Sequence, residues 1–147
     1  MTPEKLGLTL TKPDEVWGVL METGYPQAVA SLAAFASDDV SLYFSSGGGI
    51  IGLGSHLGPK QAAESFLATA QQFVQQMQPT KSFPLPQMGA TRFYVLTVNG
   101  AHTAVGKEDD LGYGRHLLSP LFHKGHELIT EIRKVDEQLR GRHQAQG

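Results

Sequence analysis

The sequence contains no cysteine. This absence excludes disulfide bonds and thiolate metal sites, and it suits a reducing compartment. The chain also lacks any run of about 18–20 apolar residues, the length needed to cross a bilayer. Its first residues do not place a long apolar run after a basic segment, as a signal peptide would. We therefore expect a cytoplasmic protein without membrane insertion.

Charge is scarce and nearly balanced. Charged residues make up 18% of the chain, and the net charge is −2. A surface that binds nucleic acid is normally strongly basic, so we expect no nucleic acid partner. The length of 147 residues and the 40% hydrophobic content fit one folded domain. We expect a single domain over residues 1–147, with an ordered core at about residues 13–140.

The first half of the chain predicts a helix, a hairpin and a second helix. Pro13–Thr23 has a proline and two acids in its first turn, followed by apolar residues, which favours a helix. The runs Ala28–Phe35 and Val40–Ser45 flank a short polar turn and predict an antiparallel hairpin. Pro59–Gln78 repeats apolar residues at helical spacing and predicts the clearest helix of the chain.

The second half predicts two strands and a helix after a proline-bearing connector at Thr80–Gly89. Arg92–Val98 and Ala101–Lys107 are joined by Asn99-Gly100, a pair that suits a tight hairpin turn. The final helix is expected over Ser119–Arg140, with Ser119 as its N-cap.

This order of elements resembles the roadblock/LC7 family and its longin and profilin-like relatives. The resemblance covers roughly residues 13–140 and depends on element order, since no motif with chemical content carries it. It implies an α/β fold of the α+β type, with a five-stranded, mostly antiparallel sheet in the order α-β-β-α-β-β-β-α. The central helix would cover one face and the terminal helices the other. The middle strand would fall near Lys81–Leu85, where Pro84 and Pro86 depart from the pattern and put the usual edge-strand dimer in doubt.

The family resemblance implies a non-catalytic module that binds, scaffolds or regulates other proteins. Such a module would be a homodimer and would act with a protein partner such as a small GTPase. No site residue of the family can be placed on this chain position by position.

The central helix offers the first candidate interface. Its polar face is rich in glutamine and nearly free of charge, so it would lose water more cheaply than a charged face. The alternatives are that another part of the same chain covers this face, or that it is simply polar and solvated. The candidate interface residues are Gln61, Glu64, Gln71, Gln72, Gln75 and Gln76.

The glycine-rich stretch at residues 45–56 offers a second candidate, a loop that binds a small molecule or a nucleotide. Ser46, Gly47, Gly48 and Gly49 follow a strand and precede a helix, as in a phosphate-binding loop. Apolar residues interrupt the glycines, however, and the lysine before the helix is not followed by Ser or Thr. The alternative is a strand that continues past the glycines.

No catalytic residue, metal site or cofactor is expected. His123 and His126 stand three residues apart near Glu127, but the zinc pattern H-E-x-x-H is absent. The acidic runs Asp38-Asp39 and Glu108-Asp109-Asp110 fall in expected turns, where Asp is common for local reasons. No nucleophile elbow is present.

Overall fold

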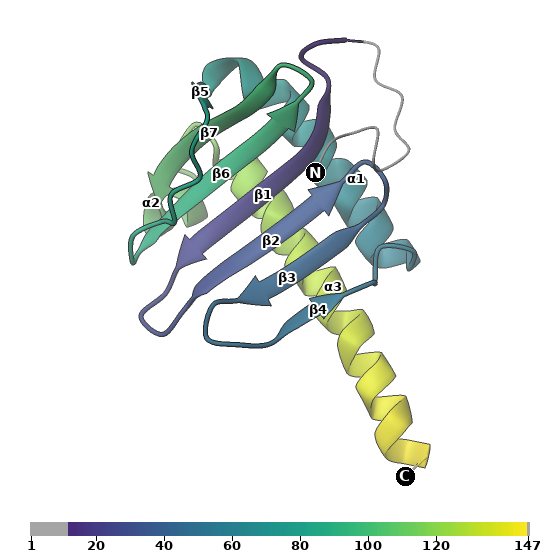
Figure 1. Ribbon diagram of the computed structural model, residues 1–147. Coiled ribbons are helices and arrows are strands. Elements are labelled where there is room, and N and C mark those ends of the chain that lie inside the picture. The colour runs from purple at the N-terminus through teal and green to yellow at the C-terminus, as the bar shows by residue number, and fades with distance from the viewer. Residues whose placement is uncertain (1–11, 147) are drawn as a thin grey trace.

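The computed structural model describes residues 12–146 of the chain, with side chains described as far as Gly141. Within this range the chain forms one antiparallel sheet of seven strands, in the order β4-β3-β2-β1-β6-β7-β5, with three α-helices (Figure 1). The strands are β1 (Val16–Gly24), β2 (Val29–Phe35), β3 (Val40–Phe44), β4 (Gly49–Ile51), β5 (Gln78–Thr80), β6 (Ala90–Thr97) and β7 (Gly100–Lys107). The helices are α1 (Leu57–Phe73), α2 (Glu108–Gly112) and α3 (Ser119–Gln146), and a 3-10 turn follows α1 at Val74–Gln76.

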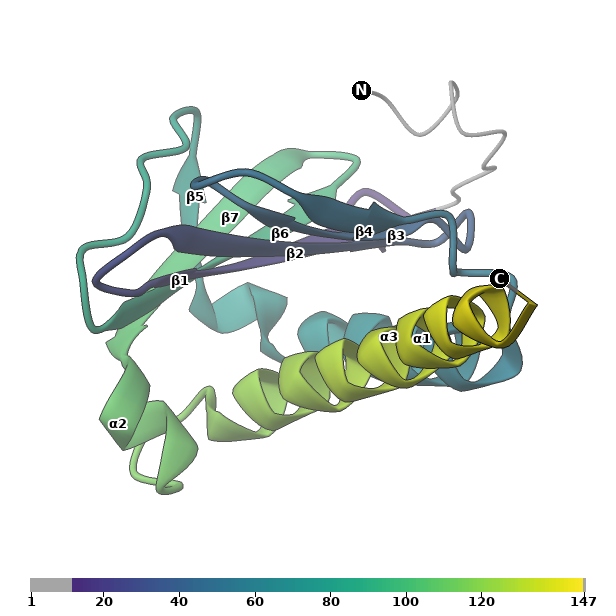
Figure 2. The same cartoon turned by 90° about the horizontal axis from the view of Figure 1, so that it is seen from below.

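The two long helices, α1 and α3, lie side by side on the same face of the sheet (Figure 2). Their apolar faces meet that face of the sheet in one core. Phe66 of α1 and Leu128 of α3 are fully buried there, as are the sheet residues Val19 and Phe93. Burial of this apolar surface is the main source of stability for the fold.

The expected helix at Pro13–Thr23 is wrong, because this segment is the central strand β1. It pairs with β2 on one side and β6 on the other, with Leu20 opposite both Ala33 and Tyr94. A strand buried on both faces loses the apolar–polar alternation that identifies strands in a sequence. The proline and acids before it, which suggested a helix start, lie in the turn that leads into β1.

The expected sheet is wrong in strand number and in the placement of its helices. The sheet has seven strands instead of five, and among residues 12–146 no terminal helix covers the second face. The coarser α+β class is correct. The additional strands β4 and β5 are edge strands of three residues each. The strand expected near Lys81–Leu85 is not formed, and the partner of β7 at that edge is β5, which also takes up Gln78 from the expected central helix.

Both expected hairpins are confirmed, since β2 pairs with β3 and β6 with β7. The second turn lies one residue earlier than predicted. Thr97 pairs with Gly100, so the turn residues are Val98 and Asn99, and Gly100 takes the positive φ of 118°. A glycine in this position fits a turn followed by a bulge instead of a two-residue Asn-Gly turn.

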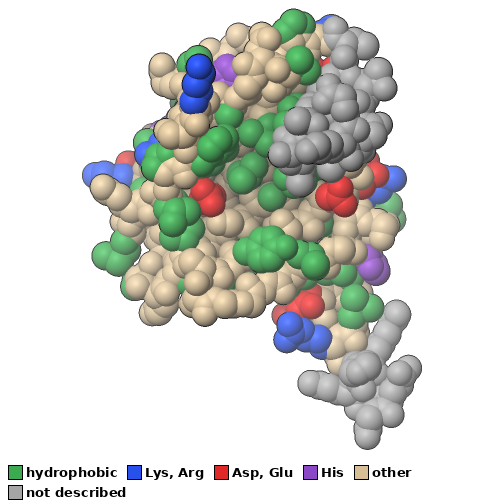
Figure 3. All heavy atoms as spheres, viewed as in Figure 1, with side chains coloured by type: hydrophobic (Ala, Val, Ile, Leu, Met, Phe, Trp, Pro, Cys, Tyr) green, Lys and Arg blue, Asp and Glu red, His purple; other side chains and the backbone are tan. Residues whose placement is uncertain are grey.

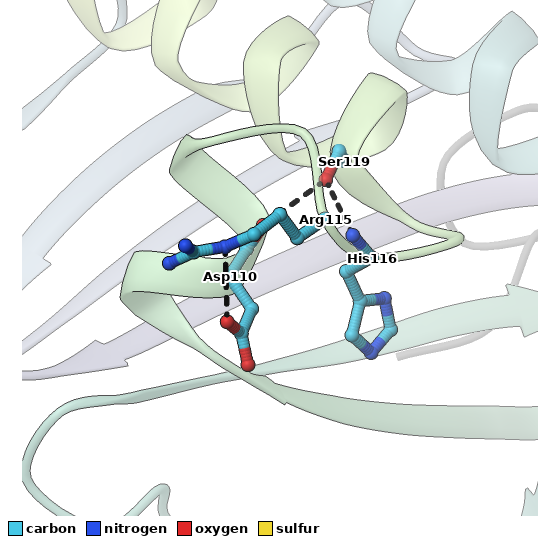
Figure 4. A network of polar contacts seen from close by, with 4 residues as sticks. All are labelled: Asp110, Arg115, His116 and Ser119. Carbon is cyan, nitrogen blue, oxygen red and sulfur yellow. Dashed lines mark hydrogen bonds and ion pairs between the residues drawn. The ribbon is translucent and has the colours of Figure 1, made fainter.

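The corner between α2 and α3 is held by short polar contacts (Figure 4). The Ser119 hydroxyl accepts a hydrogen bond from the backbone N–H of His116 at 3.2 Å and lies 3.5 Å from the Asp110 carbonyl oxygen, to which it donates. The Arg115 Nε lies 3.4 Å from the Asp110 carboxylate. Ser119 therefore fixes the loop before α3, which sets where the first turns of that helix lie against the sheet.

Candidate functional site

The sheet face opposite α1 and α3, here called the open face, has no helix layer over it within the described residues (Figure 2). Side chains from paired strands share a face, so the strand registers identify its three rows. The rows are Phe35, Gly18, Leu96 and Ala101; then Ile51, Ser41, Ala33, Leu20, Tyr94 and Thr103; then Tyr43, Ser31, Glu22, Arg92 and Val105.

The open face is largely apolar. Hydrophobic side chains gather over its middle (Figure 3). Tyr43, Ile51 and Val105 remain 51%, 63% and 47% exposed, which is high for residues of these types. The centre of the face is more buried, with Tyr94 and Glu22 at 0% and 9% exposed. When helices cover one face of an antiparallel sheet, the other face normally meets water and is polar, so exposed apolar side chains there mark a surface suited to a partner.

A polar strip crosses the centre of the third row. Ser31 donates a hydrogen bond of 2.7 Å to the Glu22 carboxylate, which is nearly buried. Arg92 stands opposite Glu22 in the register, and its buried Nε has no hydrogen-bond partner among the described residues. The third row therefore places one acidic and one basic side chain side by side on the open face.

The segment between β5 and β6 extends the apolar surface at one end of the open face. Phe83 packs on Tyr94 with ring centroids 4.8 Å apart, and the Tyr94 hydroxyl donates to the Pro84 carbonyl. Burial raises the pKa of Tyr94, with an opposing effect of the Arg92 charge and a further rise from Glu22. Leu85 and Met88 of the same segment are 62% and 71% exposed. They form an apolar rim beside the open face.

The candidate glutamines of the central helix all lie on exposed positions of α1 and the turn after it, and two of them have partners inside the chain. Gln71 accepts a hydrogen bond from the Val16 N–H at 2.8 Å and donates to the Asp14 carbonyl at 3.0 Å. Gln75 donates to the Asp14 carboxylate at 3.1 Å. These two side chains hold the segment that enters β1, although both remain exposed. Gln61, Glu64, Gln72 and Gln76 are exposed, and their role as an interface stays a prediction.

The glycine-rich loop forms the turn of the β3–β4 hairpin. Gly47 and Gly48 have φ angles of 120° and 85°, and the Phe44 N–H donates to the Gly48 carbonyl at 3.2 Å. The glycines thus connect two antiparallel strands, and residues 52–56 separate β4 from α1. The alternative of a strand that continues past the glycines is therefore wrong, because the chain reverses direction there and starts a new strand. Ile50 packs against the core, whereas Ile51 is on the open face.

The acidic runs and the histidines do not form a metal centre. Within the described residues no group of three or more histidine, aspartate or glutamate side chains is placed to hold an ion. Asp39 accepts a hydrogen bond of 2.6 Å from Ser37 in the β2–β3 turn, and Glu108–Asp110 form the first turn of α2. His123 is exposed, and His126 packs against Phe122 with ring centroids 4.4 Å apart.

Comparison with known proteins gives no relative: no family model, no curated protein and no solved structure matches this chain. In the part of the chain that the structure describes, no helix combines the length and apolar character needed to span a membrane.

Sequence reasoning missed the open face, because its residues come from the segment predicted as a helix and from positions on five other strands. One signal was available. Val16–Met21 contains no charged residue, which is typical of a strand in the middle of a sheet.

Proposed function

We propose that the protein is a non-catalytic binding module that forms a homodimer through the open faces of two sheets. The observation that carries the proposal is an apolar sheet face without a helix layer in the described part of the chain, with three large, exposed apolar side chains on it. Packing two such faces together buries the apolar rows of both copies, as in a sheet-on-sheet sandwich.

The polar strip supports a second copy as the occupant of this face. A two-fold axis brings each patch against itself, so an interface must be self-complementary. Glu22 and Arg92 are adjacent in the register, so a two-fold axis can bring Arg92 of one copy close to Glu22 of the other. The sheet edges are poorer interfaces. β4 and β5 have three residues each, and Pro79 of β5 has no backbone N–H to donate.

The test is the mass in solution, measured by size-exclusion chromatography with light scattering at tens of micromolar. We expect the wild type to have twice the chain mass. The double variant Ile51→Lys/Val105→Lys should have the chain mass, because two lysines would have to be desolvated in the interface. Both positions are exposed, so the fold should be kept, which far-UV circular dichroism and the urea midpoint can verify.

The matched control is Gln72→Lys/Gln76→Lys, two exposed positions on the other side of the molecule, which should leave the dimer intact. A dimer broken only by this control would place the interface on the central helix and overturn the proposal. A wild-type monomer would also overturn it. Removal of residues 1–11 tests another occupant: a dimer that appears only after this deletion would mean that the segment itself takes the open face.

The alternative function, binding of a small molecule or nucleotide by the loop at residues 45–56, has weaker support, since its glycines form a hairpin turn. A role beside a small GTPase depends on the family resemblance alone.

A further inference from the structure

A cavity of about 460 Å³ lies on the helix side of the sheet, away from the open face. It is bounded by the β1–β2 turn, the ends of β2 and β3, and the middle of α3. Its floor is apolar and includes the buried Leu42, with Phe44 and Ile129 beside it. This volume is within the range of cavities that hold small ligands.

The polar lining of the cavity is concentrated toward its exposed rim. Arg133 and Tyr25 are both exposed, and Gln27 and Ser46 add an amide and a hydroxyl. These groups come from α3, from the β1–β2 turn and from the β3–β4 turn. The guanidinium, the amide and the hydroxyl around this opening are all able to donate hydrogen bonds to an anion.

His126 lines the same cavity one turn of helix before Ile129. Its Nε2 atom is buried and has no hydrogen-bond partner among the described residues. Burial lowers the pKa of His126; the charge of Glu108 on α2 raises it, and His123 and Arg133 on α3 lower it further. The side chain is therefore neutral near pH 7.

The Tyr25 hydroxyl is influenced by two charged groups, Glu108 and Arg133. Burial raises the pKa of Tyr25, the charge of Glu108 and a hydrogen bond to it raise it further, and Arg133 lowers it. Glu108 itself lies in the neighbouring hollow with His123, beyond His126 as seen from the cavity. The acidic group thus faces Tyr25 and His126 from the far side, and within the cavity lining Arg133 is the permanently charged side chain.

We propose that this cavity binds a small carboxylate with an apolar body, the carboxylate toward Arg133 and His126 and the body toward Leu42, Phe44 and Ile129. The guanidinium supplies a charge-assisted hydrogen bond, which is stronger than a neutral one. Burial of the ligand's hydrocarbon against the floor supplies the apolar contribution.

The test is a titration followed by isothermal calorimetry and by amide chemical shifts, with two probes of different shape, octanoate and 3-phenylpropionate. Each is compared with its primary amide, which keeps the apolar body and removes the charge. We expect saturable binding of at least one acid, with shifts at Gln27, Ser46 and Ile129, and affinity about ten-fold or more above that of its amide.

Two variants and one control locate the binding. Arg133→Gln should lower the affinity for the acid by about ten-fold and leave the affinity for the amide unchanged. Lys134→Gln removes an exposed charge from the next position of α3, outside the cavity lining, and should change neither. Between about pH 7.5 and 6 the affinity of the wild type for the acid should rise, because a bound carboxylate favours protonated His126, and His126→Gln should abolish that rise.

Equal affinity for acid and amide, or failure of both acids to bind, would overturn the proposal. Loss of acid binding in Lys134→Gln would also overturn the proposal, because the acid would then be attracted to the positive charge of α3 in general and not to the cavity. The open-face variant Ile51→Lys/Val105→Lys should bind the acid as the wild type does, so failure of the dimer and failure of this site can be told apart.

Discussion

Gly54 shows how closely the backbone is packed where the chain leaves β4. A Cβ atom at this position would overlap the carbonyl oxygen of Asp38 in the β2–β3 turn. Neither group is the end of a flexible side chain, so the two segments would have to separate. The contact fixes the start of the connection to α1.

We predict that Gly54→Ala lowers the free energy of unfolding by about 2 kcal/mol or more, as overpacking of rigid groups does. Gly141→Ala is the control. Its added Cβ meets nothing within 4 Å in α3, and the better helix propensity should leave stability equal or higher by up to about 1 kcal/mol. Urea unfolding of both variants checks the difference, and equal midpoints would contradict the assigned contact.

At the scale of elements, α1 stabilises the sheet through side-chain hydrogen bonds as well as through its apolar face. The Gln71 side chain bridges the backbone of Asp14 and Val16, and so fixes the turn that leads into β1. The Val16 N–H is then satisfied by a side chain at a point where β1 has an irregular register with β6.

Gln71→Ala should therefore destabilise the fold by about 1–2 kcal/mol, because a part-buried N–H loses its acceptor. Gln72→Ala, on the next position of the same helix, lacks these contacts with Asp14 and Val16 and should change stability by less than about 0.5 kcal/mol. Chemical denaturation of the pair is the measurement. A Gln72 variant as unstable as the Gln71 variant would assign the loss to helix propensity instead.

The elements differ in how far the sequence could predict them. The β2–β3 hairpin was predictable, because Val40, Leu42 and Phe44 alternate with polar residues on a strand with one buried face. β1 was not, since residues on both of its faces are buried and the alternation disappears. Strands of three residues, such as β4 and β5, contain too few positions for any period to show.

At the scale of the whole molecule, the candidate sites were harder to predict than the elements. Tyr25, Ser46 and Arg133 line the same cavity but come from distant parts of the chain, and no local sequence pattern indicates that they lie together. The open face depends on strand order and on the absence of a helix layer. The single-domain size and the α+β class can be predicted from composition and element types, because neither depends on which elements contact one another.

Protonation of His126 couples the stability of the entire fold to pH. Burial lowers its pKa below the ordinary value of 6.5, so the unfolded chain binds a proton more readily than the folded chain does. The stability that neutral His126 contributes is fully present above pH 6.5. It is lost as the pH falls from there toward the lower pKa of His126 in the folded state. The free energy of unfolding should thus decrease between about pH 7 and 5.

In His126→Gln this decrease should be smaller. Urea unfolding of both proteins across the same pH range provides the comparison. An identical pH dependence in the variant would show that other groups cause the loss.

The pairing of β1 with β6 also has a consequence for how the chain folds. β1 to β4 follow one another as neighbouring hairpins, and β6 and β7 form another, so both halves of the sheet are built from local pairs. The contact between the halves joins residues 16–24 to residues 90–97, across the connection that contains α1. Closing that long loop costs entropy before any of the central pairs can form, which makes the meeting of β1 and β6 the natural kinetic bottleneck of the molecule.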